Sequence, residues 1–169
     1  MLNALRRRAE TRRLADALLA SLIVRARLPV FYERLGVPDT MDGRFDLLTL
    51  HAWLVFDRLV QQQADALSQS LVDALFVQFD EALREQGAGD MGMGRRLTKM
   101  ADAFYGRLKA YREAPNEAAL ADAILRNLYR GDAGKIEQAG AVAMYVSAVR
   151  ERFTQADLST GTLDFGPEP

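Results

Sequence analysis

The stretch Gly43-Arg-Phe-Asp-Leu-Leu-Thr-Leu-His-Ala-Trp-Leu-Val-Phe-Asp-Arg-Leu-Val-Gln-Gln-Gln63 decides the fold. Its apolar residues recur at helical spacing but point in every direction around a helix axis: Phe45, Leu47, Leu48, Leu50, Trp53, Leu54, Val55, Phe56, Leu59 and Val60. A helix that is apolar all round has to be covered by other elements. We therefore expect residues 43–63 to form the central helix of the molecule.

Helical periodicity continues on both sides of this stretch, and no five-residue segment alternates like a half-buried strand. The pattern predicts an all-α fold, a single-domain bundle of about six to seven helices. Besides the central helix, helices are expected up to about Ala26 and over 29–35, 65–86, 95–113, 116–130 and 135–153. The expected caps are Asp42 and Asn116 at helix starts and Gly131 as a C′ residue.

Three segments are expected along the chain. Residues 1–13 form a basic extension of the first helix, and residues 14–153 form the helical domain. Residues 154–169 form a tail in which only a few side chains can dock on the core: Leu158, Leu163 and Phe165.

The composition leaves little catalytic chemistry. The 169 residues contain no cysteine and one histidine, His51, which excludes disulfides, thiolate metal sites, cysteine nucleophiles and His-His metal pairs. No motif supplies His51 with a catalytic partner, so we expect it to be buried and hydrogen-bonded to a backbone carbonyl. The sequence indicates a protein that is not an enzyme and uses no cofactor.

Charge is distributed unevenly. Residues 1–35 carry eight arginines and three acids, whereas residues 36–169 carry 14 basic and 20 acidic groups. A cluster of five arginines precedes the apolar run 14–24: Arg6, Arg7, Arg8, Arg12 and Arg13. That run would span only about 16 Å as a helix, too short for a membrane.

Since no cleavage site follows this apolar run, no signal peptide is predicted. We expect a cytoplasmic location, peripheral at the inner face of the membrane.

Two interpretations of the basic end stay open. It attaches the protein to an anionic membrane or to RNA, or it is the solvated tip of a helix that docks further along. The acidic balance of the remaining chain argues against general nucleic-acid binding and against specific DNA.

The glycine-rich segment 87–94 contains a literal G-x-G-x-x-G. A helix is expected before it, whereas a dinucleotide site requires a strand, so the match is accidental. A weaker possibility is that free amides at the start of helix 95–113, with Arg95 and Arg96, hold a phosphate or carboxylate. The alternative is a hinge between helices.

The connector between residues 26 and 45 is dense in proline, glycine and aromatic residues. Phe31 and Tyr32 adjoin each other, so a short helix cannot bury both in the same direction. Either an aromatic side chain is exposed as a binding surface, or both pack under the connector.

The chain also resembles the ubiquinol–cytochrome c chaperone family over about residues 15–130. The resemblance in the first half rests on Arg27-Leu-Pro29-Val-Phe31-Tyr32, Gly36-Val-Pro-Asp39-Thr40, Gly43-Arg44-Phe45, Leu50-His51, Trp53-Leu54 and Arg58-Leu59. In the second half it rests on Leu83-Arg84-Glu85, Gly87-Ala-Gly89-Asp90, Gly94-Arg95-Arg96, Met100, Ala103-Phe104-Tyr105-Gly106-Arg107, Tyr111, Arg126-Asn127 and Tyr129.

The resemblance implies an all-helical assembly chaperone of the cytochrome bc1 complex without an active site. Its expected partners are nascent cytochrome b or another bc1 subunit, a small partner protein, and the ribosome or an anionic membrane surface. The chain starts almost at the domain, without a long presequence, so a bacterial member is expected. The alternative is a helical protein that binds a small ligand or a phospholipid head group through 89–96.

Two sets of residues are the resulting candidates. Attachment to a membrane or ribosome is expected from the five N-terminal arginines. Client or partner binding is expected from Phe31, Tyr32, Pro38, Asp39, Arg44, Met91, Met93, Arg95, Arg96 and Lys99, because exposed aromatic and methionine side chains suit variable apolar partners.

Overall fold

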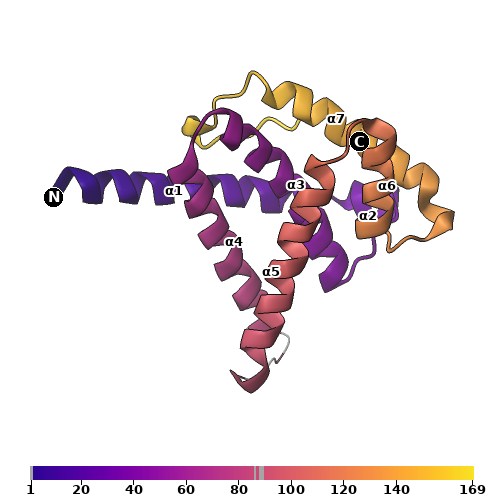
Figure 1. The fold of residues 1–169 in the computed structure, drawn as a ribbon, viewed down its shortest axis with the longest axis horizontal. Coiled ribbons are helices and arrows are strands. Elements are labelled where there is room, and N and C mark those ends of the chain that lie inside the picture. The colour runs from indigo at the N-terminus through magenta and orange to yellow at the C-terminus, as the bar shows by residue number, and fades with distance from the viewer. Residues whose placement is uncertain (1, 86, 88–89) are drawn as a thin grey trace.

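The computed structural model describes residues 2–85, 87 and 90–169 (Figure 1). This part of the chain forms seven α-helices: α1 (Leu2–Ala26), α2 (Pro29–Glu33), α3 (Met41–Gln61), α4 (Asp65–Glu85), α5 (Asp90–Arg112), α6 (Glu117–Leu128) and α7 (Ile136–Phe153). Short 3₁₀ turns occur at Ala133–Lys135 and Leu158–Thr160. The described residues contain no strand, which confirms the all-α prediction.

The central position of α3 is also confirmed. It contacts α1, α4, α5, α6 and α7, and Leu47, Trp53 and Leu59 on different sides of its axis are all buried. Because apolar surface on every side is removed from water, this one helix organises the whole core.

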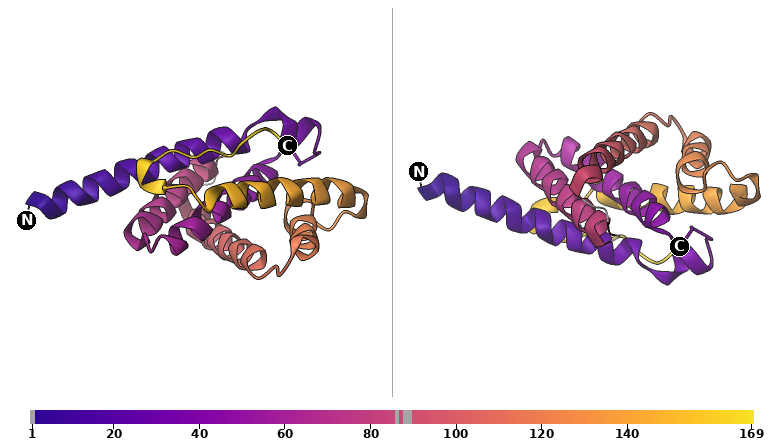
Figure 2. Two further views of the ribbon diagram at one scale, coloured as in Figure 1. Left: turned by 90° about the horizontal axis from the view of Figure 1, so that it is seen from above. Right: turned by 90° about the horizontal axis from the view of Figure 1, so that it is seen from below.

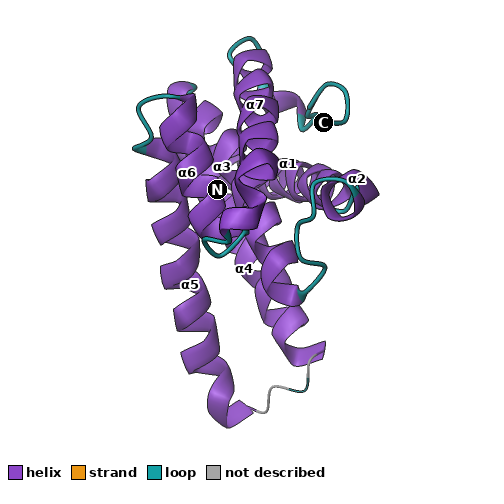
Figure 3. Ribbon diagram, turned by 90° about the vertical axis from the view of Figure 1, so that its right-hand side faces the viewer, coloured by secondary structure: helices purple, strands orange, loops and turns teal. Residues whose placement is uncertain are grey.

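Around α3 lie α1, the pair α4 and α5, and the pair α6 and α7. Figures 1 and 2 show α1 along the long axis of the molecule, with its N-terminal part extending beyond the body. In Figure 3, α4 and α5 run side by side away from α6 and α7. Within the described residues, no helix has an apolar stretch long enough to cross a membrane.

The C-terminal tail packs along α1 (Figure 2). Leu158 and Phe165 are buried and Leu163 is half-buried, as expected from the sequence. The Arg25 guanidinium of α1 donates hydrogen bonds to the backbone carbonyls of Gly166 and Pro167. The tail is thus held both by apolar burial and by a side chain of the first helix.

Three local predictions about helix ends need correction. The N-cap of α3 is Thr40, not Asp42, because the Thr40 hydroxyl accepts from the Gly43 amide at 3.1 Å. After α6, Arg130 rather than Gly131 is the first residue with positive φ, at 57°, and Gly131 follows at 74°. The predicted cap at Asn116 is confirmed, since its side chain accepts from the Ala119 amide at 2.9 Å.

The third correction concerns α5, which begins at Asp90 rather than at residue 95. Gly92 and Gly94 therefore belong to the helix. The amides of Arg95 and Arg96 lie beyond the first four residues of α5, whose N–H groups alone lack an intrahelical acceptor. The weaker possibility, an anion site on free amides of a helix that begins at residue 95, therefore does not hold, because that part of the chain lies inside α5.

Candidate functional site

The connector between α2 and α3 folds back tightly on the first turn of α3. Gly36 has a φ of 63°, a conformation that favours glycine. At Gly43 an added Cβ atom would lie only 1.9 Å from the carbonyl oxygen of Pro38, so only glycine fits against this backbone. Together with the Thr40 cap, this contact fixes where the connector lies relative to α3.

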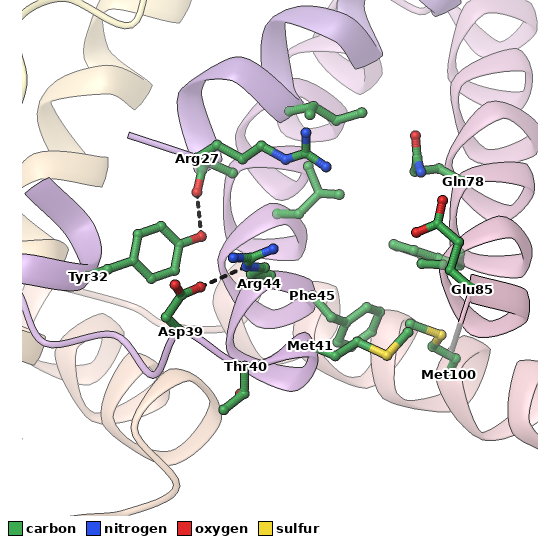
Figure 4. A pocket seen from close by; sticks show the side chains of 15 residues that line it. Arg27, Tyr32, Asp39, Thr40, Met41, Arg44, Phe45, Gln78, Glu85 and Met100 are labelled. Carbon is green, nitrogen blue, oxygen red and sulfur yellow. Dashed lines mark hydrogen bonds and ion pairs between the residues drawn. The ribbon is translucent and has the colours of Figure 1, made fainter. Parts of the chain in front are cut away.

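Beside the connector, the surface contains a groove of about 440 Å³ (Figure 4). We call it the connector groove. One wall comes from the end of α1, α2 and the connector, the opposite wall comes from α4 and α5, and the start of α3 lies between them. It is lined by Ile23, Ala26, Arg27, Tyr32, Asp39, Thr40, Met41, Arg44, Phe45, Leu48, Gln78, Phe79, Ala82, Glu85 and Met100.

The base of the connector groove is apolar and its edge is polar. Phe45 and Phe79 are buried and pack edge to face, with ring centroids 5.1 Å apart. Half-buried Leu48, Met41 and Met100 extend this apolar surface. Such a combination of an apolar base and a charged edge is typical of sites for an amphipathic segment.

Polar groups on the connector wall mostly satisfy one another. Arg44 Nε lies 2.7 Å from Asp39 Oδ1, and this hydrogen bond lowers the pKa of the Asp39 carboxyl. The Tyr32 hydroxyl donates to the carbonyl oxygen of Ala26 at 2.7 Å, and burial raises the pKa of Tyr32. These bonds link the connector to the first turn of α3 and link Tyr32 to the end of α1.

The structure brings part of the predicted partner-binding set together here. Tyr32, Asp39 and Arg44 all line the connector groove, and Pro38 is exposed next to Asp39. Phe31, in contrast, is 0% exposed, so the structure adopts the alternative in which this ring packs in the core.

The remaining members of that set lie on α5, away from the groove lining. Met93 is buried, at 6% exposure, so it is not the exposed methionine that was expected. The side chain of Met91 falls outside the described residues. Arg95, Arg96 and Lys99 are exposed and form a basic surface on the first half of α5.

The five N-terminal arginines are exposed on the first half of α1: Arg6, Arg7, Arg8, Arg12 and Arg13. Because successive residues of a helix are about 100° apart, these side chains are distributed around the whole axis. Leu5 on the same part of the helix is 61% exposed. This end of α1 therefore carries positive charge on most sides of its axis.

Behind the connector wall, Phe31 packs against a buried hydrogen-bond chain. Its ring meets His51 and Tyr145 at centroid distances of 5.2 and 5.5 Å. The Leu47 carbonyl lies 2.8 Å from His51 Nδ1, so Nδ1 must carry the proton. His51 Nε2 then accepts from the Tyr145 hydroxyl at 3.0 Å, and that oxygen accepts from Arg25 Nε at 2.8 Å.

These hydrogen bonds confirm the structural role predicted for His51. The ring is fully buried, and burial is the main cause that lowers its pKa to about 4. A neutral imidazole whose two nitrogens are both bonded is a support for the core and not a group poised for proton transfer.

A second buried polar cluster supports the groove from below. Asp46 is 0% exposed and lies 2.7 Å from Arg107 Nε of α5 and 2.8 Å from an Arg130 nitrogen after α6. Burial raises the pKa of Asp46 to about 6 in spite of the two guanidinium groups. Arg107 also lies over the Phe45 ring, 5.3 Å from its centroid, so the cluster positions the base of the groove.

Sequence reasoning missed the groove residues on α4 and α5, and it missed Arg27, just past the end of α1. Along the sequence, nothing sets Gln78, Glu85 or Met100 apart from the other residues of their helices. The sequence gives only their local positions: Arg27 is at the start of the connector, and Glu85 is at the end of α4. Nothing in the spacing shows that these two ends face each other across a groove.

Comparison with known proteins gives a consistent result. Residues 33–160 match the model of a family described as ubiquinol-cytochrome C chaperone. The crystal structure of the Cbp3 homolog from Brucella abortus superposes with a TM-score of 0.85 at 31% identity, covering 98% of this chain and 96% of that chain.

Two curated relatives are more distant. The mitochondrial protein CBP3 of Saccharomyces cerevisiae is 28% identical over 151 residues, which is 81% of this chain and 44% of the yeast protein. Ubiquinol-cytochrome-c reductase complex assembly factor 1 of Xenopus laevis is 24% identical over 102 residues, 58% of this chain and 51% of the frog protein. The chain thus spans about half the length of these relatives.

Proposed function

The chain belongs to the ubiquinol-cytochrome C chaperone family, and from this premise we propose that it assists assembly of the cytochrome bc1 complex by holding a segment of newly made cytochrome b in the connector groove. The observation that carries the proposal is the open apolar base of Phe45, Leu48 and Phe79 between two polar walls. An unassembled membrane protein exposes apolar segments that would otherwise aggregate, and a groove of this kind shields them.

Holding requires no chemical step, in keeping with a family of chaperones. The groove contains flexible Met41 and Met100 beside rigid aromatic rings. Methionine repacks easily around different apolar shapes, so the base can accept a client that has not yet folded. The connector wall is held by the Arg44–Asp39 and Tyr32–Ala26 hydrogen bonds, so this wall needs little ordering when a client enters.

We also propose that the cationic end of α1 attaches the chaperone to an anionic surface where the client is made. Its arginines surround the axis, whereas a helix that lies in a membrane surface needs an apolar face. This distribution supports ribosomal RNA over lipid, because phosphates can approach this end of α1 from several sides. Arg95, Arg96 and Lys99 on α5 could add to the same attachment.

Photo-crosslinking in growing cells tests the groove. A crosslinking amino acid at Glu85, which lines the groove, should capture cytochrome b, whereas one at Glu81, exposed one helical turn earlier and outside the lining, should not. Deletion of the gene should lower the amount of bc1 complex. Equal capture at both positions, or normal bc1 levels after deletion, would refute the proposal.

Sedimentation tests the attachment. Replacing the five N-terminal arginines by glutamine should release the protein from ribosomes, and raising the salt concentration should release the unchanged protein. Binding to vesicles with anionic lipid, but not to ribosomes, would contradict the choice of RNA. Binding that neither salt nor the substitutions alter would exclude the electrostatic attachment altogether.

A further inference from the structure

The two walls of the connector groove carry charges of opposite sign. Arg27, just past the end of α1, is an exposed cation on one wall, and Glu85, the last residue of α4, is an exposed anion on the other. In Figure 4 the Arg27 guanidinium extends into the groove from one side, and the Glu85 carboxylate lies on the opposite wall. Apolar atoms of Phe45 and Met41 lie between the walls.

These two charges differ from the other charges of the groove because neither has a partner within the described residues. Arg44 and Asp39 are paired with each other at 2.7 Å. Arg27 and Glu85 form no ion pair or side-chain hydrogen bond in the described part of the chain. Each is therefore available to a molecule that enters the groove.

The position of Glu85 is also unfavourable for a carboxylate. It occupies the last residue of α4, where the carbonyl end of the helix dipole carries partial negative charge. The neighbouring Arg84 pairs with Asp80 at 2.8 Å. Carboxylates further from this end of α4 do not experience the repulsion. At Glu85, a positively charged group of another molecule would relieve it.

From this arrangement we infer that the connector groove selects client segments by charge order: a short apolar run with an acidic residue at the end that meets Arg27 and a basic residue at the end that meets Glu85. The inference rests on the proposed function and specifies the client chemistry. A space of about 440 Å³ is at the lower end of ligand sites and holds roughly a few bulky side chains. The flanking charges of so short a run would therefore reach both walls.

Labelled peptides of defined charge test the inference directly. One leucine and alanine core is synthesised with an acid at one end and a base at the other, with acids at both ends, with bases at both ends, and with glutamine at both ends. Fluorescence anisotropy with the full chain should show tightest binding for the mixed peptide. Since exposed ion pairs are weak, each correct pair should improve affinity by at most about fivefold.

Charge reversals should redirect this preference. Glu85→Lys should make the all-acidic peptide the best ligand, and Arg27→Glu should do the same for the all-basic peptide. The matched controls are Glu81→Lys and Arg34→Glu, which reverse exposed charges outside the groove lining and should leave the mixed peptide preferred. High salt should remove all of these differences.

The possible failures are distinguishable. Equal binding of all peptides by every variant overturns the charge-order inference while leaving the groove as a binding site. Ala82→Trp, which places a large ring in the groove, should abolish binding of every peptide while the thermal midpoint stays near that of the unchanged protein. Peptide binding that survives Ala82→Trp, or no binding at all, overturns the connector groove as the site and the inference with it.

Discussion

Replacing Gly43 by alanine is expected to destabilise the protein although alanine is the better helix former. The added Cβ would lie 1.9 Å from the Pro38 carbonyl oxygen and 3.0 Å from its carbon, so the connector must move. Overpacking of this kind costs about 1–3 kcal/mol. Movement of the connector also weakens the Thr40 cap, which contributes about 1 kcal/mol. The gain in helix propensity is at most about 1 kcal/mol, so the net loss should be about 1–3 kcal/mol.

Urea unfolding measures this loss. The only tryptophan, Trp53, is buried in α3, so its fluorescence reports loss of the core. Gly106→Ala is the matched control, because Gly106 lies inside α5 and no atom lies within 4 Å of its added Cβ. This control should gain about 0.5–1 kcal/mol. The reasoning is refuted if Gly43→Ala is as stable as the unchanged protein or if both substitutions change stability in the same direction.

Three further predictions concern the buried polar groups and the tail. Because the folded-state pKa of His51 is lowered to about 4, protonation of His51 favours the unfolded state. Between pH 6.5 and 4, the free energy of unfolding, measured in urea, should fall by about 3 kcal/mol more for the unchanged protein than for His51→Gln. Parallel pH profiles of the two proteins would contradict this. Arg107→Leu should lower the free energy of unfolding by about 3 kcal/mol at pH 8, because it leaves the buried Asp46 carboxylate without this partner. The loss should be smaller at pH 5, where Asp46 is protonated and neutral. A loss that does not depend on pH would contradict the pairing. Phe165→Ala should cost about 3 kcal/mol and make the tail sensitive to limited proteolysis, whereas a tail that stays resistant would show that Arg25 alone holds it.

Sequence reasoning succeeded where the signal is local. The apolar surface on all sides of residues 43–63 predicts a central helix without knowledge of its neighbours, and the cap at Asn116 follows from the preference of asparagine for helix starts. The buried state of His51 followed from the absence of any partner for catalysis. Helix starts were less accurate, since Thr40 and Asp42 are both good caps and only the fold of the connector decides between them.

The groove could not be predicted for a physical reason. Its walls come from the ends of α1 and α4, which are brought together by tertiary packing and not by spacing along the chain. Asp46 illustrates the same limit: a carboxylate at a helical position reads as exposed, yet it is buried because Arg107 and Arg130 converge on it. Phe31 was expected on the surface or in the core, and its contacts with His51 and Tyr145 place it in the core.

Different residues fix the connector and carry the two unpaired charges of the connector groove. Phe45 is positioned from below by Arg107, and the connector is held by the close contact at Gly43 and the cap at Thr40. Arg27 and Glu85, in contrast, have no described partners. Since exposed, unpaired side chains contribute little to folding stability, these two positions can change with the client while the groove keeps its shape. On the proposed function, a client can engage Arg27 and Glu85 without breaking the Gly43 contact or the Thr40 cap, which hold the connector.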